Sequence, residues 1–270
     1  MIIDIHTHMD DVVGGGIVLN GEERAKYQKY IADLNDMRKY LAELEKISLD
    51  ITGDESVFAC VLDVEPNTKY ENILNYSVED RRILPFIAPD FTLPKEIMVE
   101  RIKKFGGSSY GMKIHPIIQG IRVNEEIVFS AIEAYLEFEK PVILHTGRAD
   151  YSNYFKPCPY DKNKSDIEST RDLLKKYPGL NVVLGHAGMF EHEEWAKELS
   201  GYNNAYIDSS FKYAKEYTLL KKYYGPDRIL FGSDFPFYEP SDIDDIKEAF
   251  TTEEQIMLFE TTPKRLLKLI

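Results

Sequence analysis

The chain has 270 residues, of which 43% are hydrophobic, and this composition indicates a folded globular protein rather than a disordered one. A formal net charge of −13 makes nucleic acids and anionic membranes unfavourable partners, because like charges repel. The cysteines Cys60 and Cys158 form no CxxC pattern, no apolar run is long enough to span a membrane, and no leader precedes the first motif, so we expect a cytoplasmic protein without a thiolate zinc site.

Eight short apolar runs recur along the chain and are typical of parallel strands that are covered on both faces. These runs are Ile2–His8, Val57–Val64, Ile83–Pro89, Gly111–His115, Val142–Thr146, Val182–His186, Ala205–Ser209 and Ile229–Asp234. Amphipathic stretches between them predict helices, most clearly over Asn35–Ile47, Asn124–Glu139, Asp166–Lys176 and Tyr213–Lys222. This alternation favours an α/β protein with a single (β/α)8 barrel domain over residues 1–270, and an open doubly wound sheet is the alternative.

Two connections are too long for simple turns and are interpreted as loop insertions, at about residues 10–29 and 148–164. The first contains the glycine run Gly14–Gly16, and the second is rich in tyrosine, phenylalanine and proline. Both follow predicted strand ends, where barrel enzymes place their active-site loops. We therefore expect a rim that shapes substrate specificity, with plain surface decoration as the alternative.

Five of the six histidines stand at or near the ends of predicted strands. They are His6, His8, His115, His145 and His186. A lone histidine is usually a satisfied core or surface group, but the carboxyl ends of barrel strands converge on one face. We therefore expect these imidazoles to meet there.

The first strand carries Asp4, His6 and His8 at alternate positions, so their side chains are expected to share one face. Asp4, one step deeper, is expected to orient an imidazole from behind, as carboxylates beside metal-binding histidines do. Glycines on both sides of His186 are expected to allow the close approach of a ligand.

Asp234 ends the last apolar run, where a carboxylate is costly to bury unless it meets a cation or hydrogen bonds. A helix cap would also explain it. Together the strand ends supply three histidines and one carboxylate for a metal, with one further histidine for proton transfer. These are the residue types that a metal-dependent hydrolytic centre requires.

These motifs, in this order, resemble the amidohydrolase superfamily and specifically its amidohydrolase-2 branch. The resemblance extends to Gly111–Pro116, Tyr224–Asp234 and Thr262–Leu267, and it covers nearly the whole chain except about residues 10 to 55. It implies a (β/α)8 barrel with one divalent metal, zinc before manganese or iron. The resemblance also implies the roles of the residues: metal ligands are His6, His8, His145 and Asp234, and His186 is a proton-transfer residue or an additional metal ligand. Either Asp234 or His186 is implied to transfer the proton.

Three further residues are predicted to bind substrate. Lys113 lies on the fourth strand and is expected to stay cationic and to contact a substrate carboxylate or a strand neighbour; the alternative is the carboxylated lysine that bridges two metals in binuclear members of the superfamily. His115 is expected to contact substrate or to support a metal ligand. Arg148 is expected to hold an anionic substrate group, with a solvated surface arginine as the alternative.

The resemblance implies a metal-dependent hydrolase that uses a metal-activated water on a C–N or C–O bond of a small cyclic amide, lactone or ester. The alternative is a non-oxidative decarboxylase of a small unsaturated or aromatic carboxylate, because the branch includes enzymes similar to aminocarboxymuconate-semialdehyde decarboxylase. A non-catalytic metal-binding protein is disfavoured because the ligand set is complete. A small-molecule substrate and, by family habit, a homo-oligomer are expected.

Overall fold

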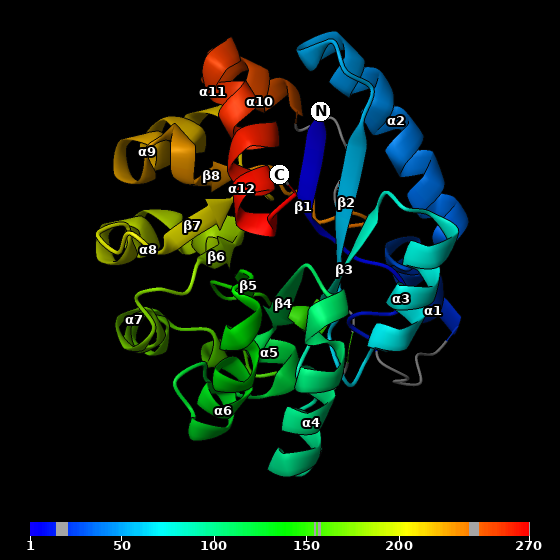
Figure 1. Ribbon diagram of the computed structural model, residues 1–270, viewed down its shortest axis with the longest axis vertical. Coiled ribbons are helices and arrows are strands. Elements are labelled where there is room, and N and C mark those ends of the chain that lie inside the picture. Colours follow the sequence, from blue (N-terminus) through cyan, green and yellow to red (C-terminus); the bar gives the residue numbers. More distant parts are fainter. Residues whose placement is uncertain (15–20, 154, 156–157, 238–242, 270) are drawn as a thin grey trace.

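A computed structural model describes residues 1–14, 21–153, 155, 158–237 and 243–269 (Figure 1). Eight parallel strands form one sheet in sequence order, and helices surround it (Figure 1). The strands are β1 Ile2–Thr7, β2 Val57–Leu62, β3 Ile83–Ile87, β4 Gly111–Ile114, β5 Val142–His145, β6 Val182–Gly185, β7 Ala205–Asp208 and β8 Ile229–Leu230. The α-helices are α1 Gly21–Tyr27, α2 Leu34–Thr52, α3 Tyr70–Glu79, α4 Lys95–Phe105, α5 Pro116–Gln119, α6 Glu126–Tyr135, α7 Ile167–Lys176, α8 His192–Leu199, α9 Ala214–Tyr224, α10 Ile243–Ala249, α11 Thr252–Ile256 and α12 Thr262–Leu267.

The sheet closes on itself between β1 and the segment that follows β8. The backbone N–H of Ile5 donates to the carbonyl of Phe231 at 2.9 Å. Further along, the N–H of Asp234 donates to the carbonyl of His6 at 2.8 Å, and the N–H of His8 donates to Phe235 at 2.7 Å. The predicted (β/α)8 barrel is therefore confirmed, and the open sheet is wrong.

Every predicted strand begins at the predicted residue but ends one to four residues earlier. The apolar runs continue into the first residues of the loops, where the backbone leaves the sheet. At β6 the reason is His186, whose φ of 61° is incompatible with a strand, and Asp234 after β8 has a φ of 58°. The two residues predicted to carry the chemistry are thus the ones that turn away from the barrel.

The helices follow their predicted positions, with different ends. α2 starts after Asp33, whose side chain accepts from the N–H groups of the first turn, and it ends at Gly53 with φ 70°. It therefore runs past the predicted end at Ile47. The helix predicted from Asn124 starts two residues later, as α6, and the side-chain amide of Asn124 donates to Asp172 at 2.9 Å.

Apolar side chains pack in two layers, outside and inside the barrel. Along β5, Val142 and Leu144 belong to the large cluster that includes the helices, whereas Ile143 belongs to a smaller cluster made mainly of strand side chains. This alternation is what a strand with an outer and an inner face requires. Among the helices of the described ranges, none has the length and apolar character needed to cross a membrane.

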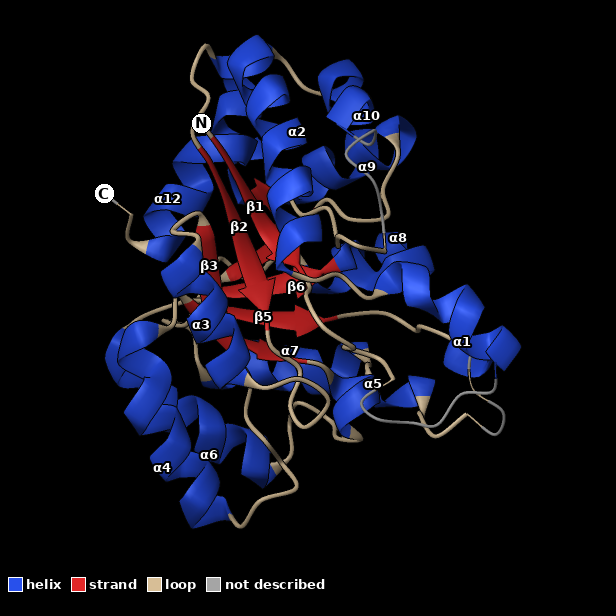
Figure 2. Ribbon diagram, turned by 90° about the vertical axis from the view of Figure 1, so that its right-hand side faces the viewer, coloured by secondary structure: helices blue, strands red, loops and turns tan. Residues whose placement is uncertain are grey.

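The two long connections meet beyond the carboxyl ends of the strands, where Figure 2 shows α1. Val12, Tyr27 and Phe155 are buried in a common apolar cluster there. The hydroxyl of Tyr160 donates to the carbonyl of Val13, which ties one connection to the other. Residues 15–20, which include most of the glycine run, and residues 154 and 156–157 lie outside the described residues.

Candidate active site

Five imidazoles converge at the carboxyl ends of the strands, as the sequence predicted. The ring of His6 lies 5.2 Å from that of His8 and 4.7 Å from that of His186, measured between centroids. His145 lies 4.7 Å from His186 and stacks on His115 at 4.0 Å. Strands that are far apart in the sequence thus bring their histidines into one buried cluster.

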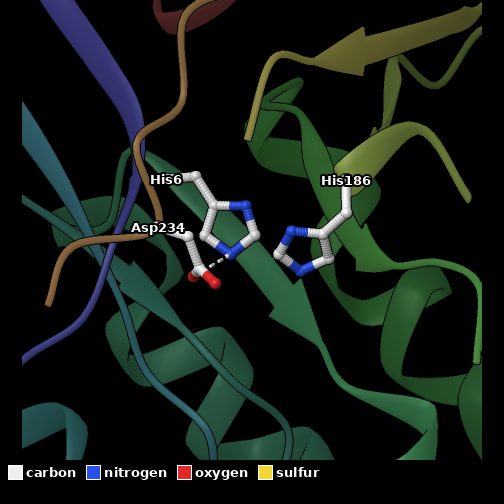
Figure 3. A group of neighbouring side chains, drawn as sticks. All are labelled: His6, His186 and Asp234. Carbon is white, nitrogen blue, oxygen red and sulfur yellow. Dashed lines mark ion pairs between the residues drawn. The ribbon is translucent and has the colours of Figure 1, made fainter. Parts of the chain in front are cut away.

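Each imidazole of the first strand presents Nε2 to Asp234. Nδ1 of His6 donates to Asp208 Oδ2 at 2.7 Å, and Nδ1 of His8 donates to the carbonyl of Leu62 at 3.1 Å. Because these oxygens only accept, both Nε2 atoms keep their lone pairs. Each Nε2 lies 3.3 Å from Asp234 Oδ1, and Figure 3 shows His6 and Asp234 side by side.

The donor atoms of this cluster fit a divalent metal. One nitrogen or oxygen from each of His6, His186 and Asp234 lies within 4.8 Å of the others (Figure 3). Nε2 of His145 is buried and has no hydrogen-bond partner among the described residues, an arrangement that is costly without a ligand. Imidazole nitrogens with one carboxylate suit zinc, manganese or iron.

Asp208, at the end of β7, is a buried residue of the site that the sequence analysis missed. Its Oδ2 accepts from the His6 ring, and its Oδ1 accepts from the backbone of His186 at 2.9 Å and from the hydroxyl of Ser210 at 2.5 Å. A carboxylate that ends a buried apolar strand was the available signal, the same one that identified Asp234. Asp208 thereby fixes the ring of one histidine and the backbone of another.

The expectation for Asp4 is wrong. Its carboxylate accepts from the backbone N–H of His6 at 3.0 Å, from the Ser233 hydroxyl at 2.6 Å and from the Tyr40 hydroxyl, and it touches no imidazole nitrogen among the described residues. The pairing of β1 with β2 shifts register between Asp4 and Thr7, so strict alternation does not continue along the strand. Asp4 instead joins β1 to the segment that carries Asp234.

Hydrogen bonds to both the side chain and the backbone of His186 fix this residue. Nδ1 lies 2.7 Å from the Ser210 hydroxyl. The flanking glycines make room for protein atoms. A Cβ on Gly185 would lie 2.7 Å from the carbonyl oxygen of Leu144, and one on Gly188 would lie 2.4 Å from the Trp195 ring. Close packing therefore explains both glycines without a ligand.

Lys113 is fully buried behind the imidazoles. Its Nζ lies 3.1 Å from Nε2 of His6, and burial lowers the pKa of this amine to about 8. The lysine therefore donates to the same lone pair of His6 Nε2 that would bind a metal. The ammonium group and a metal ion cannot both occupy that lone pair. The described wall of the cavity does not include Lys113.

A cavity of about 450 Å³ opens above the cluster, between the two long connections. His115 and Arg148, both predicted to bind substrate, line it. His115 accepts from the N–H of Ile118 through Nδ1, and its Nε2 lies 3.2 Å from the Tyr151 hydroxyl. Arg148 lies at the exposed side and pairs with Glu191 at 3.2 Å.

Burial favours the neutral form of four imidazoles of the cluster. Desolvation lowers the pKa of His6, His115 and His186 well below the ordinary value, and it lowers the pKa of His145 to about 3. Burial also raises the pKa of the Asp234 carboxyl, an effect that a bound cation would oppose. The nitrogen lone pairs are therefore available as ligands at neutral pH.

The whole chain is similar in structure to several solved proteins. The 2,6-dihydroxybenzoate decarboxylase from Rhizobium has a TM-score of 0.75 at 15% identity, covering 99% of this chain and 98% of that one. A dihydroxybenzoic acid decarboxylase from Polaromonas sp. JS666, with bound manganese and the inhibitor 2-nitroresorcinol, has a TM-score of 0.69 at 16% identity and coverages of 99% and 97%.

A 5-carboxyvanillate decarboxylase from Novosphingobium aromaticivorans, also with bound manganese, has a TM-score of 0.68 at 13% identity and coverages of 99% and 97%. At these identities the similarity shows the fold. No curated protein matches the sequence. A family model described as Amidohydrolase matches residues 3–269, which is nearly the entire chain. The chain therefore belongs to the amidohydrolase family, whose metal-dependent scaffold it shares.

Proposed function

We propose that this protein is a metal-dependent, non-oxidative decarboxylase of a small aromatic or otherwise unsaturated carboxylate. The observation that carries the proposal is the wall of the cavity above the histidine cluster. Its apolar part consists mainly of aromatic and aliphatic side chains: Val12, Val13, Tyr27, Tyr30, Met189, Phe190, Phe211 and Phe237. Such a wall accommodates a planar ring better than it accommodates a polar amide or ester.

The apolar wall also suits the chemistry. A carboxylate concentrates its negative charge before CO₂ leaves, and the charge spreads as the bond to the ring carbon breaks. Surroundings that exclude water therefore raise the energy of the reactant more than that of the transition state. The similar solved decarboxylases support this proposal over the hydrolase that the sequence analysis put first.

For the metal we propose the ligands predicted from the sequence, His6, His8, His145 and Asp234. A divalent cation held there would neutralise charge on the substrate's carboxylate or on a neighbouring ring oxygen. Zinc is the metal we expect from the ligand types, and manganese, which is bound in two of the similar structures, is the first alternative.

The protein must also supply a proton. Breaking the bond to the carboxylate leaves an electron pair on the ring carbon, and that carbon takes up one proton as CO₂ departs. Asp234 and His186 both line the cavity beside the cluster, so we propose them as the groups that deliver this proton. We propose that His115 contacts the ring and that Arg148 holds an anionic substituent at the mouth. For Lys113, which lies behind His6, we propose no direct contact with the substrate.

The test of this proposal follows the proton that replaces the carboxylate. Metal-free protein is loaded with zinc or manganese and offered 2,6-dihydroxybenzoate, 5-carboxyvanillate and matched esters and lactones in D₂O. We expect CO₂ release and a product with one deuterium on the carbon that lost the carboxylate. Metal-free protein and Asp234→Asn should give neither. Hydrolysis of an ester or lactone without CO₂ from any carboxylate would overturn the proposal in favour of the hydrolase.

A further inference from the structure

Lys212 is a buried lysine that forms no ion pair in the described part of the chain. It follows β7, and its side chain is almost completely buried. Its ammonium donates to the carbonyl of Met189 at 2.9 Å and to that of Phe211 at 3.4 Å. Burial lowers the pKa of this amine to about 8, so it remains mainly protonated at neutral pH. The hydrogen bonds of this buried ammonium go to backbone carbonyls, and the carboxylates of Asp208 and Glu216 attract it from beyond ion-pair distance. Burying a charge without an ion pair is costly.

The segment that Lys212 contacts is strained. His186, Ala187 and Met189 have φ values of 61°, 45° and 53°, and Gly188 between them has φ 86°. Three residues with side chains within four positions rarely adopt such a backbone, except where neighbouring groups enforce it. Figure 3 shows His186, the first of these residues, beside His6 and Asp234.

Different groups enforce the two halves of this segment. The His186 half is held by Asp208, which accepts from its N–H, and by the Ser210 hydroxyl at its ring. Gly188 donates to the Thr146 hydroxyl at 2.9 Å. Beyond Gly188, the shortest hydrogen bond that fixes the carbonyl of Met189 comes from Lys212, since His192 lies 3.4 Å away.

Met189, Phe190 and Phe211 line the cavity, and Phe190 is 89% exposed at its mouth. Lys212 bonds to the first and last of these three residues, and so joins the loops after β6 and β7 into one wall. We propose that Lys212 is a positioning residue that holds the Met189–Phe190 segment and so sets the shape of the cavity for a ring-bearing ligand. The ring-bearing ligand rests on the proposed function, whereas the positioning of the segment does not.

The tryptophan of the chain offers a readout that does not need activity. Trp195 is the only tryptophan in the sequence, it is buried, and its ring packs against Gly188. Its emission maximum and its quenching by acrylamide therefore report on the strained segment. We expect Lys212→Met to shift the emission to the red and to raise the quenching constant severalfold, and Lys212→Arg to restore most of the original signal because arginine can still donate to Met189.

The matched control is Lys215→Met, which removes a lysine that is 84% exposed only three positions away. It should leave Trp195 unchanged. Hydrogen exchange at residues 187–190 should accelerate in Lys212→Met and not in the control. The melting temperature and circular dichroism of Lys212→Met should stay close to those of the unmutated protein, because removing a buried charge that forms no ion pair need not weaken the fold. Unchanged fluorescence and exchange in Lys212→Met would overturn the proposal, and so would a global loss of structure in Lys212→Arg.

The ligand arm uses 2-nitroresorcinol, the inhibitor bound in the Polaromonas decarboxylase, with calorimetry on the metal-loaded protein. We expect the Kd to rise about tenfold in Lys212→Met, the range that follows from losing one charge-assisted hydrogen bond. An unchanged Kd together with altered fluorescence would overturn the link to the cavity. No binding by the unmutated protein would count against the ring-bearing ligand and the proposed function, while the tryptophan and exchange results would still decide the positioning role.

Discussion

Replacing Asp208 with asparagine should weaken metal binding far more than the loss of a single hydrogen bond suggests. Oδ1 of Asp208 accepts from three donors, the N–H of His186 and both the N–H and the hydroxyl of Ser210, whereas Oδ2 accepts from His6 Nδ1 alone. The asparagine oxygen must therefore take the place of Oδ1, because an NH₂ group there would face two backbone donors. The NH₂ group then points at the imidazole of His6.

That orientation changes the tautomer of His6. To accept from the new NH₂ group, Nδ1 must give up its hydrogen, and the hydrogen moves to Nε2, the atom that faces Asp234. A protonated Nε2 cannot be a metal ligand. Disruption of a carboxylate that orients a metal-binding histidine typically lowers metal affinity 10- to 100-fold, which corresponds to about 1.4 to 2.7 kcal/mol. We expect Asp208→Asn to reach at least the upper part of that range.

The assay is competition for zinc and for manganese against a chelating dye at pH 7.5, with circular dichroism to verify the fold. Asp63→Asn is the matched control, because Asp63 is equally buried beyond β2 but accepts from Thr68 and the backbone of Ala88 instead of a histidine. It should bind metal with unchanged affinity. Equal affinities in Asp208→Asn and the unmutated protein would refute the reasoning that the His6 tautomer controls the site.

Three other predictions concern metal content, pH and packing. Mass spectrometry should find one divalent metal per chain, lost in His6→Ala and kept in Lys113→Met; two metals, one of them lost in Lys113→Met, would instead indicate a carboxylated bridging lysine. Burial raises the pKa of Asp63 from its ordinary 3.8 to about 8, so the folded protein binds the proton more tightly than the unfolded chain, and its stability should fall as the pH rises between these values. Urea unfolding at pH 5 and pH 8 should show a smaller decrease in Asp63→Asn, and an equal decrease would contradict this. Gly188→Ala should destabilise the fold by about 2 to 4 kcal/mol in urea, because the new Cβ would meet Trp195 and the residue has φ 86°; a loss below about 1 kcal/mol would contradict the packing argument.

Local pattern predicted the barrel and most of the cluster. Near-continuous apolar runs locate parallel strands, and the histidines lie at their carboxyl ends, so the meeting of His6, His145 and His186 follows from the topology alone. Asp208 was within reach of the same argument, because it closes a buried strand as Asp234 does.

What the sequence could not predict depends on contacts between distant residues. Asp4 was expected to face an imidazole, but its partners are Ser233, which is 229 positions away, and Tyr40 on α2. The position of Lys113 against His6 depends equally on how β4 lies across the barrel from β1. The metal's identity, the cytoplasmic location, the homo-oligomer and the small-molecule substrate stay predictions.

The closure between β1 and the segment after β8 has a consequence for synthesis of the protein. His6 and His8 leave the ribosome long before the backbone that pairs with them and the carboxylate of Asp234. A nascent or truncated chain therefore carries two histidines that have no partners to make a tight site. A metal ion stabilises only the form of the protein that binds it. The cation would therefore stabilise chains that contain both ends of the barrel, whereas truncated chains would stay unstable and be degraded by cellular proteases.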